Sequence, residues 1–448
     1  MGSERISTKL GDHVDIITGF PFGSKDFLDK PGIRIARGDN VKKGFFDWSD
    51  GKAKYWLGIT PDLEQYLLAE GDILIGMDGS RVGENWVRVT NIDIPCLLVQ
   101  RVARIRGRKS LDQRYIRFLI GNPFFAEYIK AVHTGTSIPH ISVNQIKEYR
   151  IKIPPLREQK AIASILGALD DKIDLNRRMN QTLDEMAQAT FKSWFVDFDP
   201  VRYKASRQAP LGLAPHIADL FPDGFETSEL GEIPIGWRTS TIKENVDRIS
   251  KGTTPTKSQT GEAKDESTVL YLKVKDIDDS GYINLSGLES IPRSIHEGVL
   301  KRSILKEGDV LFTIAGTIGR VAVATKELND SNINQAIAFI RPLRSNLKSE
   351  FIRLLLTTKA IQQKTNSVIV QGVQANVSLA ELGNFKFILP PKEVLRAWEL
   401  TTGALARKRN LILDQTRVLI DIRDNLLPKL LSGELRIPDA ERIVERCM

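Results

Sequence analysis

Hydrophobic and polar positions along the chain follow two alternating patterns. Short apolar runs next to glycine and aspartate, such as residues 73–75 and 310–312, are typical of β-strands. From residue 155 to about residue 194, and again from residue 391 to about residue 431, apolar residues recur at steps of three and four. That spacing predicts two long helices, each of which would extend roughly 60 Å. The pattern therefore predicts β-rich modules that alternate with long helices.

Each predicted helix carries a heptad seam on one face. Because neither helix is apolar all round, each must bury its seam, and we expect the two to pack on each other in antiparallel orientation with seam asparagines fixing their register. The alternative, that each helix folds only against its own module, stays open. The first seam consists of Ile162, Leu166, Leu169, Ile173, Asn176, Asn180, Leu183, Ala187, Thr190 and Trp194. The second consists of Trp398, Leu405, Ile412, Leu419, Leu426 and Leu430, is interrupted by Thr402, Arg409, Thr416 and Arg423, and is widened by Leu411, Val418 and Ile422.

The β-rich modules repeat one another. The sequence Glu-Gly-Asp at 70–72 recurs at 307–309, 237 positions later, and the Pro-Pro pair at 154–155 recurs at 390–391, 236 positions later. A nearly constant offset over such a length favours an internal duplication over chance similarity of strands and turns. Further matches pair Ile105-Arg106 with Ile340-Arg341, Tyr115-Ile116-Arg117 with Phe351-Ile352-Arg353, and Ile141-Ser142 with Val377-Ser378.

The repeat predicts the fold class and the domain boundaries. We expect an α+β protein in which two similar, mostly-β domains are joined by two long antiparallel coiled-coil helices with pseudo-twofold symmetry. Residues 204–231 contain Pro210, Pro215 and Pro222 and few long apolar stretches, so they are expected to form a linker with one short helix. The predicted parts are module 1 (1–153), the first long helix with its aromatic exit segment (154–203), the linker (204–231), module 2 (232–389), and the second long helix with the C-terminal tail (390–448).

Composition narrows the class of partner. Lys and Arg number 64 against 56 Asp and Glu, which gives a net charge of +8 and a pI near 9.2. This excess favours a polyanion but does not distinguish DNA from RNA or a membrane surface. Only Cys96 and Cys447 are present, which excludes a disulfide framework and points to a reducing compartment. No apolar run approaches the roughly 20 residues that span a bilayer, so no membrane partner is expected.

The sequence offers no convincing catalytic constellation. Its five histidines are scattered without metal-ligand spacing, so neither catalytic nor metal-binding residues are expected. Residues 122–125 look like a broken version of the Asn-Pro-Pro-Phe motif of amino-methyltransferases, but the second proline is missing and a helix start fits better. The glycine-rich stretch 316–319 lies between β segments rather than opening a helix, which argues against a cofactor loop.

Binding chemistry is better represented, in polar loops that recur in both modules. The small residues of loops 78–83 and 316–320 would let backbone amides approach a phosphate, and the loops at 134–140 and 371–376 carry groups suited to reading base edges. On a strand Arg104, Arg106 and Arg108 would share a face and could follow phosphates, although a solvated sheet face is the alternative. The candidate DNA-binding residues are Arg37, Lys42, Lys43, Gly79, Ser80, Arg81, Arg104, Arg106, Thr134, Thr136, Ser137, His140, Lys251, Lys273, Lys275, Thr317, Arg320, Asn334, Gln335, Gln371 and Gln374.

Four features together resemble a known family. They are the duplicated module, the Glu-Gln at 158–159 just after the first Pro-Pro pair, the segment Phe-x-x-Trp-Phe-Val-Asp-Phe-Asp-Pro at 191–200, and Leu-Leu-Ser-Gly-Glu-Leu at 430–435. Nearly the whole chain is similar to the specificity (S) subunit of type I restriction–modification systems. One departure is visible, because the second Pro-Pro pair is not followed by Glu-Gln.

The resemblance implies a non-catalytic reader of double-stranded DNA in the cytoplasm. Each module would be a target recognition domain for one half of a split site, and the long helices would be the spacer. The chain itself would bind no cofactor: two modification (methyltransferase) subunits would carry S-adenosylmethionine, and restriction subunits would use ATP and Mg. Alternatives are the reader of a methylation-only system, a stand-alone DNA methyltransferase or nuclease, and a scaffold that binds no DNA. The resemblance suggests Glu158, Gln159, Phe191, Trp194, Phe195, Phe198, Leu430 and Leu431 as contacts to partner subunits.

Overall fold

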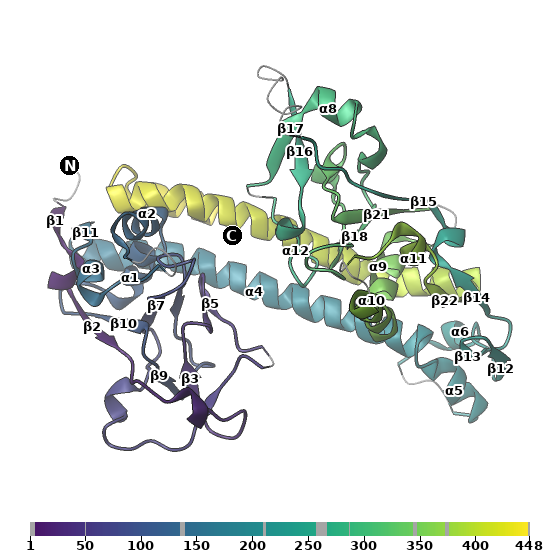
Figure 1. The fold of residues 1–448 in the computed structure, drawn as a ribbon, viewed down its shortest axis with the longest axis horizontal. Helices are drawn as coiled ribbons and strands as arrows, with labels where there is room; N and C mark the ends of the chain where they lie inside the picture. Colours follow the sequence, from purple (N-terminus) through teal and green to yellow (C-terminus); the bar gives the residue numbers. More distant parts are fainter. Residues whose placement is uncertain are drawn as a thin grey trace. The chain divides into compact units, whose positions relative to one another are not determined.

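The computed structural model describes residues 5–49, 51–134, 139–208, 212–256, 267–285, 287–343, 347–371 and 376–446. The chain divides into two compact units: unit 1 contains residues 1–178 and 412–448, and unit 2 contains residues 179–411. Each unit holds one β-rich module and a part of both long helices, α4 (Leu156–Phe195) and α12 (Lys392–Ser432) (Figure 1). The two predicted helices are therefore confirmed, with ends within a residue or so of those expected.

Module 1 is built on a four-stranded antiparallel sheet in the order β2-β10-β7-β8. A three-stranded sheet in the order β6-β3-β9, in which β3 and β9 are parallel, and two short strand pairs complete it. The strands are β1 (Ile6–Lys9), β2 (Val14–Thr18), β3 (Ile33–Ala36), β4 (Val41–Lys42), β5 (Phe45–Phe46), β6 (Tyr55–Trp56), β7 (Ile73–Gly76), β8 (Trp86–Arg88), β9 (Cys96–Leu98), β10 (Val102–Gly107) and β11 (Arg150–Ile153). The helices of unit 1 besides the long ones are α1 (Gln113–Ile120), α2 (Pro123–Val132), α3 (Val143–Lys147) and α13 (Ile437–Glu445).

Module 2 repeats the topology of both main sheets. Its four-stranded sheet runs β15-β21-β18-β19, and its three-stranded sheet runs β17-β16-β20, again with a parallel pair. The strands of unit 2 are β12 (Phe225–Ser228), β13 (Gly231–Pro234), β14 (Arg238–Thr241), β15 (Val246–Lys251), β16 (Thr268–Leu272), β17 (Glu289–Pro292), β18 (Val310–Thr313), β19 (Val321–Val323), β20 (Asn332–Ile333), β21 (Ile337–Pro342) and β22 (Lys386–Leu389). Its helices are α5 (Asp199–Ala205), α6 (Pro215–Ala218), α8 (Arg293–Glu297), α9 (Ser349–Thr357), α10 (Lys359–Gln371) and α11 (Leu379–Gly383). The internal duplication is confirmed.

One bidentate ion pair explains why the Gly-Asp and Ile-Arg matches recur together. In module 1 the Arg106 guanidinium donates to both carboxylate oxygens of Asp72, at 2.5 and 2.7 Å. In module 2 Arg341 does the same to Asp309, at 2.8 and 2.6 Å. Each aspartate also accepts a backbone N–H three residues earlier, at 2.8 Å in both modules. The pair connects the turn before β7 to β10 in module 1, and the turn before β18 to β21 in module 2. The planar guanidinium suits this two-point contact with a carboxylate.

Helix starts are also repeated, by the same local chemistry. Ser142 and Gln145 form a reciprocal capping box at the start of α3, and Ser378 and Glu381 form one at the start of α11. Such boxes satisfy backbone N–H groups that have no partner within the helix. At α2, Asn122 caps the helix and proline follows at the first position, so the helix-start interpretation of residues 122–125 is confirmed.

The long helices pack against each other in antiparallel orientation within each unit. In unit 1 the first part of α4 shares a core with the last part of α12: Ile162, Leu166 and Leu169 lie with Leu419 and Leu426. In unit 2 the last part of α4 shares a core with the first part of α12, where Phe191 and Trp194 lie with Trp398. Antiparallel packing of the seams, the first of the two alternatives, is confirmed.

Most polar residues in the seams find partners within the chain, although Asn180 Oδ1 is buried without one. Arg423 pairs with Asp170 at 3.2 Å in unit 1, and Arg409 pairs with Asp184 at 3.1 Å in unit 2. The amide of Asn176, a buried residue, donates to Gln415 at 3.1 Å. Thr402 and Thr416 are also buried and donate their hydroxyls to carbonyls four residues earlier in their own helix.

One expectation about the second helix is wrong. Leu411 and Val418 do not widen the seam, because they are 69% and 51% exposed; each lies one residue, about a quarter turn, before a seam position. Of the three, only Ile422 packs against the core of unit 1. The expected linker holds its one short helix, α6, but also strand β12, and Phe221 is buried in the core of unit 2.

Candidate nucleic-acid interface

The loops expected to read DNA are brought together in module 1 by backbone hydrogen bonds. The loop after β7 meets the loop before α3, because Gly79 N donates to Pro139 O at 3.0 Å and Ile141 N donates to Met77 O at 2.9 Å. Met77 N in turn donates to Arg101 O, at 2.9 Å, just before β10. Three chain segments that are distant in sequence therefore form one polar edge of the module.

Module 2 has the same backbone frame. Val377 N donates to Ile314 O at 3.0 Å, and Ile314 N donates to Ala336 O at 2.8 Å. Ala315 forms an isolated bridge with Asn376, as Asp78 does with His140 in module 1. The frame is thus shared, whereas the side chains that it presents differ between the modules.

The expected phosphate track on β10 is wrong. Arg104 is buried and donates to the carbonyls of Gln65 and Leu67 at 3.0 and 3.4 Å. Its burial lowers the pKa of the guanidinium. Arg106 holds Asp72, and Arg108 pairs with Asp15 at 2.8 Å. Arg104 and Arg106 therefore fasten the sheet, whereas Arg108 forms an ion pair at the surface.

Several other candidates are engaged in contacts within the chain. The Arg37 guanidinium donates to Lys52 O at 2.7 Å. Arg320 donates to Ile277 O at 2.6 Å and pairs with Asp279 at 2.7 Å. Lys273 and Lys275 both pair with Glu289. Their role in binding DNA stays a prediction, and each would have to exchange or share these contacts.

The remaining candidates are partly or fully exposed. Arg81 in the first loop has a side chain that is 67% exposed and lies 3.6 Å from Glu84. The other exposed or partly exposed candidates are Lys42, Lys43, Gly79, Ser80, Thr134, His140, Lys251, Thr317, Asn334 and Gln335. Thr136, Ser137 and Gln374 lie outside the described residues, as does the side chain of Gln371.

Sequence reasoning left two residues of this edge off the candidate list. The Arg101 guanidinium donates to Asp78 at 2.8 Å, and the other carboxylate oxygen of Asp78 contacts the ring of His140. The signal that could have identified Arg101 is its position directly before β10, the strand that pairs with β7. The alternation of side chains along β10 did not identify Arg101, because the residue precedes that strand.

The motif expected to contact partner subunits is largely internal. Gln159 is buried, and its side chain bonds Pro154 O, Ser110 O and Asp112 N at 2.9 to 3.1 Å, which joins module 1 to the start of α4. Glu158 pairs with Arg5 at 2.7 Å. Phe191, Trp194, Phe195 and Phe198 are buried in the core of unit 2, and Leu430 and Leu431 contribute to that of unit 1. The burial corrects the expectation that the aromatic side chains are free to contact a partner.

The aromatic segment is instead a packing centre. The rings of Phe191 and Phe195 lie 5.0 and 5.2 Å from the ring of Phe351 in α9, and that ring lies 5.7 Å from Trp398. Edge-to-face contacts at this distance stabilise a core beyond the apolar area that they bury. The segment thereby joins module 2 to both long helices within unit 2.

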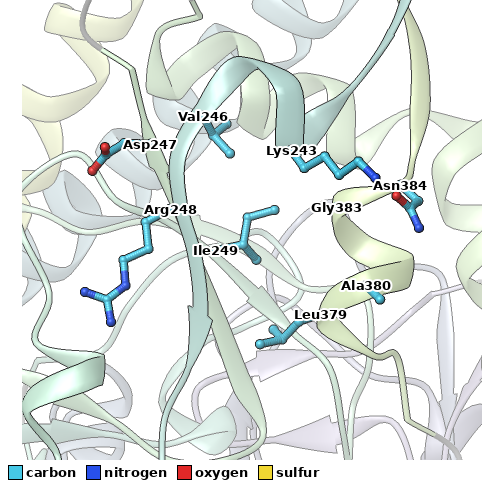
Figure 2. Close-up of a pocket in the computed structure, with 9 residues that line it drawn as sticks. All are labelled: Lys243, Val246, Asp247, Arg248, Ile249, Leu379, Ala380, Gly383 and Asn384. Carbon is cyan, nitrogen blue, oxygen red and sulfur yellow. The ribbon is translucent and has the colours of Figure 1, made fainter.

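Unit 2 also contains a cavity of about 380 Å³ between β15 and α11 (Figure 2). Lys243 extends across it toward Asn384, and Gly383 lies on the opposite wall. At the corresponding place in module 1 the identities are exchanged: Gly11 faces Lys147, whose Cβ lies 2.7 Å from where a Gly11 Cβ would be. The pocket therefore lies at a packing contact that recurs in both modules with the two residues exchanged.

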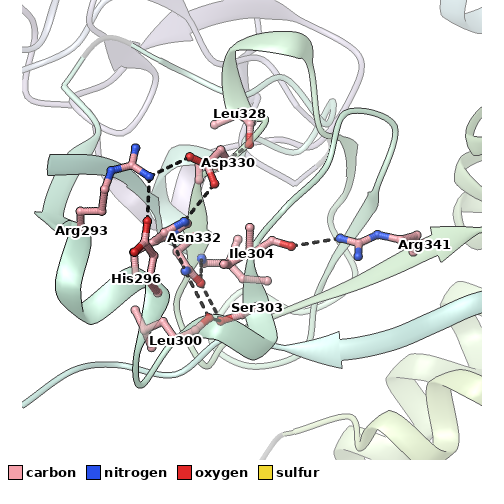
Figure 3. Close-up of polar contacts among 12 residues, drawn as sticks. Arg293, His296, Leu300, Ser303, Ile304, Leu328, Asp330, Asn332 and Arg341 are labelled. Atoms are coloured by element: carbon pink, nitrogen blue, oxygen red, sulfur yellow. Dashed lines mark hydrogen bonds and ion pairs between the residues drawn. The ribbon is translucent and has the colours of Figure 1, made fainter. Parts of the chain in front are cut away.

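A buried polar network in module 2 holds α8 to β20 (Figure 3). The amide of Asn332 donates to His296 Nδ1 at 2.9 Å, so Nε2–H donates to Asp330 at 3.1 Å. Ser303 donates to the Asn332 carbonyl oxygen at 2.6 Å. Both ring nitrogens of the fully buried His296 are therefore occupied by protein groups, which leaves no position for a substrate. The network is structural.

Across the described part of the chain, no group of three or more His, Cys, Asp or Glu side chains could hold a metal ion. Within the same residues, no helix is both long and apolar enough to cross a membrane.

Comparison with known proteins agrees with this architecture. The model of the type I restriction modification DNA specificity domain matches residues 6–185 and 234–394, one match for each module. The specificity subunit of the type I restriction enzyme HindI from Haemophilus influenzae is 28% identical and aligns over 88% of this chain and 87% of its own length. The MjaIX specificity subunit from Methanocaldococcus jannaschii is 25% identical over 77% of this chain and 74% of its own.

A solved structure shows the same fold. The S subunit of a type I restriction–modification system from M. genitalium superposes with a TM-score of 0.53 over 96% of both chains, at 15% identity. The two β-rich modules, the two antiparallel helices and the paired family matches lead to one conclusion: the chain belongs to the DNA specificity subunits of type I restriction–modification systems, which supply DNA recognition and not catalysis.

Proposed function

We propose that the chain reads a split site on double-stranded DNA, with module 1 contacting one half and module 2 the other. The observation that carries this proposal is the shared loop frame with different side chains. A frame that is kept fixes how a module lies on the duplex, while the side chains set which bases it accepts. Two frames with different side chains fit two half-sites of different sequence.

We further infer that the chain assembles with other subunits that carry the chemistry. Two modification subunits would bring S-adenosylmethionine, and restriction subunits would use ATP and Mg in the cytoplasm. Their docking faces are expected on the exposed sides of the long helices, where each unit shows apolar residues. These are Leu175 and Val418 in unit 1, and Met186, Leu400 and Leu411 in unit 2.

The long helices would also set the spacing between the half-sites. Each helix contributes residues to both units, and dimeric DNA readers likewise fix half-site spacing by the geometry of their protein frame. Inserting one heptad into α4 should change the number of base pairs between the halves or abolish assembly. Unchanged spacing with intact assembly would remove the spacer role.

Module exchange tests the proposed function most directly. Replacing residues 232–389 by the second module of a different specificity subunit, in cells that contain the partner subunits, should change one half of the methylated site and leave the other half unchanged. Mapping of methylated sites measures this. A change in both halves, or in neither, would contradict one module reading one half-site.

Arg81 offers a test of phosphate contact with a matched control. Because its side chain is largely exposed on the loop, Arg81→Ala should weaken binding to all sequences and reduce the dependence of log K on log salt by about one unit. Arg108→Ala is the control, since Arg108 is exposed but follows β10 at its opposite end. An unchanged salt slope in Arg81→Ala would exclude it from the phosphate contacts. We also expect Arg320→Ala to weaken binding, although its contacts to Asp279 and Ile277 make loss of loop order part of that effect.

A further inference from the structure

Arg101 has an unusual backbone conformation at the edge of module 1. Its φ is +66°, in the left-handed region that residues other than glycine seldom adopt. Its side chain is 70% exposed, so no burial of that side chain compensates the conformation. Strained residues of this kind concentrate where a side chain must be aimed at a ligand. The conformation therefore makes Arg101 a candidate for function.

Asp78 fixes the direction in which the Arg101 guanidinium points. One carboxylate oxygen accepts from Arg101 Nη1 at 2.8 Å, and the other contacts the His140 ring. The carboxylate is itself only 19% exposed, and its loop is anchored by the Gly79–Pro139 backbone hydrogen bond. The guanidinium is thus held in advance, at one point of its planar fork, with its other donors left toward solvent.

Module 2 shows that the fold does not need these three side chains. Two of the backbone hydrogen bonds, from Val377 N to Ile314 O and from Ile314 N to Ala336 O, and the same isolated bridge occur there with Ala315, Ala336 and Asn376 in place of Asp78, Arg101 and His140. A charged set that one copy of the frame carries and the other lacks is not required for folding. It is a difference in what the two modules can recognise.

The chemistry of the set favours a base pair over a phosphate. Asp78 is hydrogen-bonded to the Arg101 guanidinium, unlike Glu84, which lies 3.6 Å from Arg81 and is paired with Lys130. A carboxylate bonded in this way disfavours a phosphate at the guanidinium, whereas it can accept a hydrogen bond from the amino group of cytosine. An arginine fork pairs with the O6 and N7 atoms of guanine in the major groove. We propose that Arg101 and Asp78 read one G·C base pair in the half-site of module 1, with Arg101 on guanine, Asp78 on cytosine and His140 positioning the carboxylate. This rests on the proposed function, that module 1 contacts DNA.

Selection from a pool of random duplexes tests the proposal, using the full chain assembled with its modification subunits. The wild-type complex should select a split motif that contains an invariant G·C pair in the half assigned to module 1 by module exchange. Arg101→Ala should relax that one position by tenfold or more and leave the rest of the motif intact. Asp78→Asn, which keeps the shape but removes the charge, should relax the same position. Arg108→Ala, an exposed arginine beyond the other end of β10, should change nothing.

Each outcome separates this inference from the proposed function. A wild-type complex that selects no motif would overturn the proposed function itself. A split motif that Arg101→Ala leaves unchanged, or weakens equally at every sequence, would overturn only the base-reading role and make Arg101 inert or a phosphate contact. A wild-type motif without a G·C pair in that half would also overturn it. Thermal melting of Arg101→Ala and of Arg108→Ala should match that of the wild type, which would show that the fold is kept.

Discussion

Replacing Asp309 by asparagine should destabilise module 2 more than the equivalent change at Asp72 destabilises module 1. Both aspartates are almost fully buried, with side chains 1% and 3% exposed, and both form the same bidentate pair. The arginines differ, because the Arg341 side chain is 15% exposed and that of Arg106 is 40% exposed. Water can therefore solvate the abandoned charge of Arg106 more fully than that of Arg341, which keeps its hydrogen bond to Ile304 O.

The magnitudes follow from that difference in exposure. Leaving a buried charge without its partner costs about 3–5 kcal/mol, which we expect for Asp309→Asn. For Asp72→Asn we expect about 1–2 kcal/mol, close to the loss of a charged hydrogen bond beside solvent. Hydrogen exchange of the amides in β21 and β10 measures each module separately. Asp279→Asn serves as a control with a loss of at most about 1 kcal/mol, since Asp279 is 88% exposed and its ion pair with Arg320 lies at the surface. Equal losses in the two modules, or no loss for Asp309→Asn, would refute the reasoning.

Two further changes test packing and charge in the same way. Gly11→Ala should lower the free energy of unfolding by about 1–3 kcal/mol, because the new Cβ would lie 2.7 Å from Lys147 Cβ. Gly383→Ala should be tolerated, since the nearest atoms to its new Cβ lie at 3.3 and 3.4 Å. Urea unfolding would measure both variants, and equal effects would contradict this reasoning. Burial alone would raise the pKa of Glu350, but Arg353 and Arg409 outweigh it and lower the pKa to about 2, so the stability that this carboxylate contributes is present above its ordinary pKa and is lost as the pH falls toward 2. Glu350→Gln should therefore flatten the fall in urea midpoint between pH 5 and pH 3, and an unchanged slope would show that the cluster does not act through Glu350.

Much of the fold could be predicted because the spacing of apolar residues and the internal repeat of the sequence determine it. The steps of three and four from Ile162 to Trp194 require a long helix with one apolar face, and the repeated Glu-Gly-Asp and Ile-Arg sequences mark positions that pair in space. The first signal lies within one helix, and the second lies in sequences that recur about 236 positions later, so both can be read from the sequence alone. Leu411 and Val418 show the limit of this prediction, because the sequence does not say whether an apolar residue a quarter turn from the seam faces the core or solvent.

The site was harder to predict, because it depends on which side chains the fold has already engaged. Arg104 and Arg106 have the charge and spacing of a phosphate track, but one is buried against carbonyls and the other holds Asp72. Phe191 and Phe195 have the aromatic density of an interface, yet they build a core. Conversely, Arg101 has no periodic neighbours, and only the backbone frame shows that it lies beside Asp78 and His140. Charge and motif identify candidates, and contacts decide among them.

The exchanged glycine and lysine positions limit how these modules can recombine. Gly11 faces Lys147 in one module, and Lys243 faces Gly383 in the other. A crossover between modules that falls between these two positions would place lysine against lysine or leave glycine opposite glycine, so a hybrid would inherit either crowding or a void. Shuffling of whole modules avoids the mismatch. We therefore expect the coding sequences of whole modules to be exchanged intact. New DNA specificities should arise by replacement of an entire module and not by recombination within one.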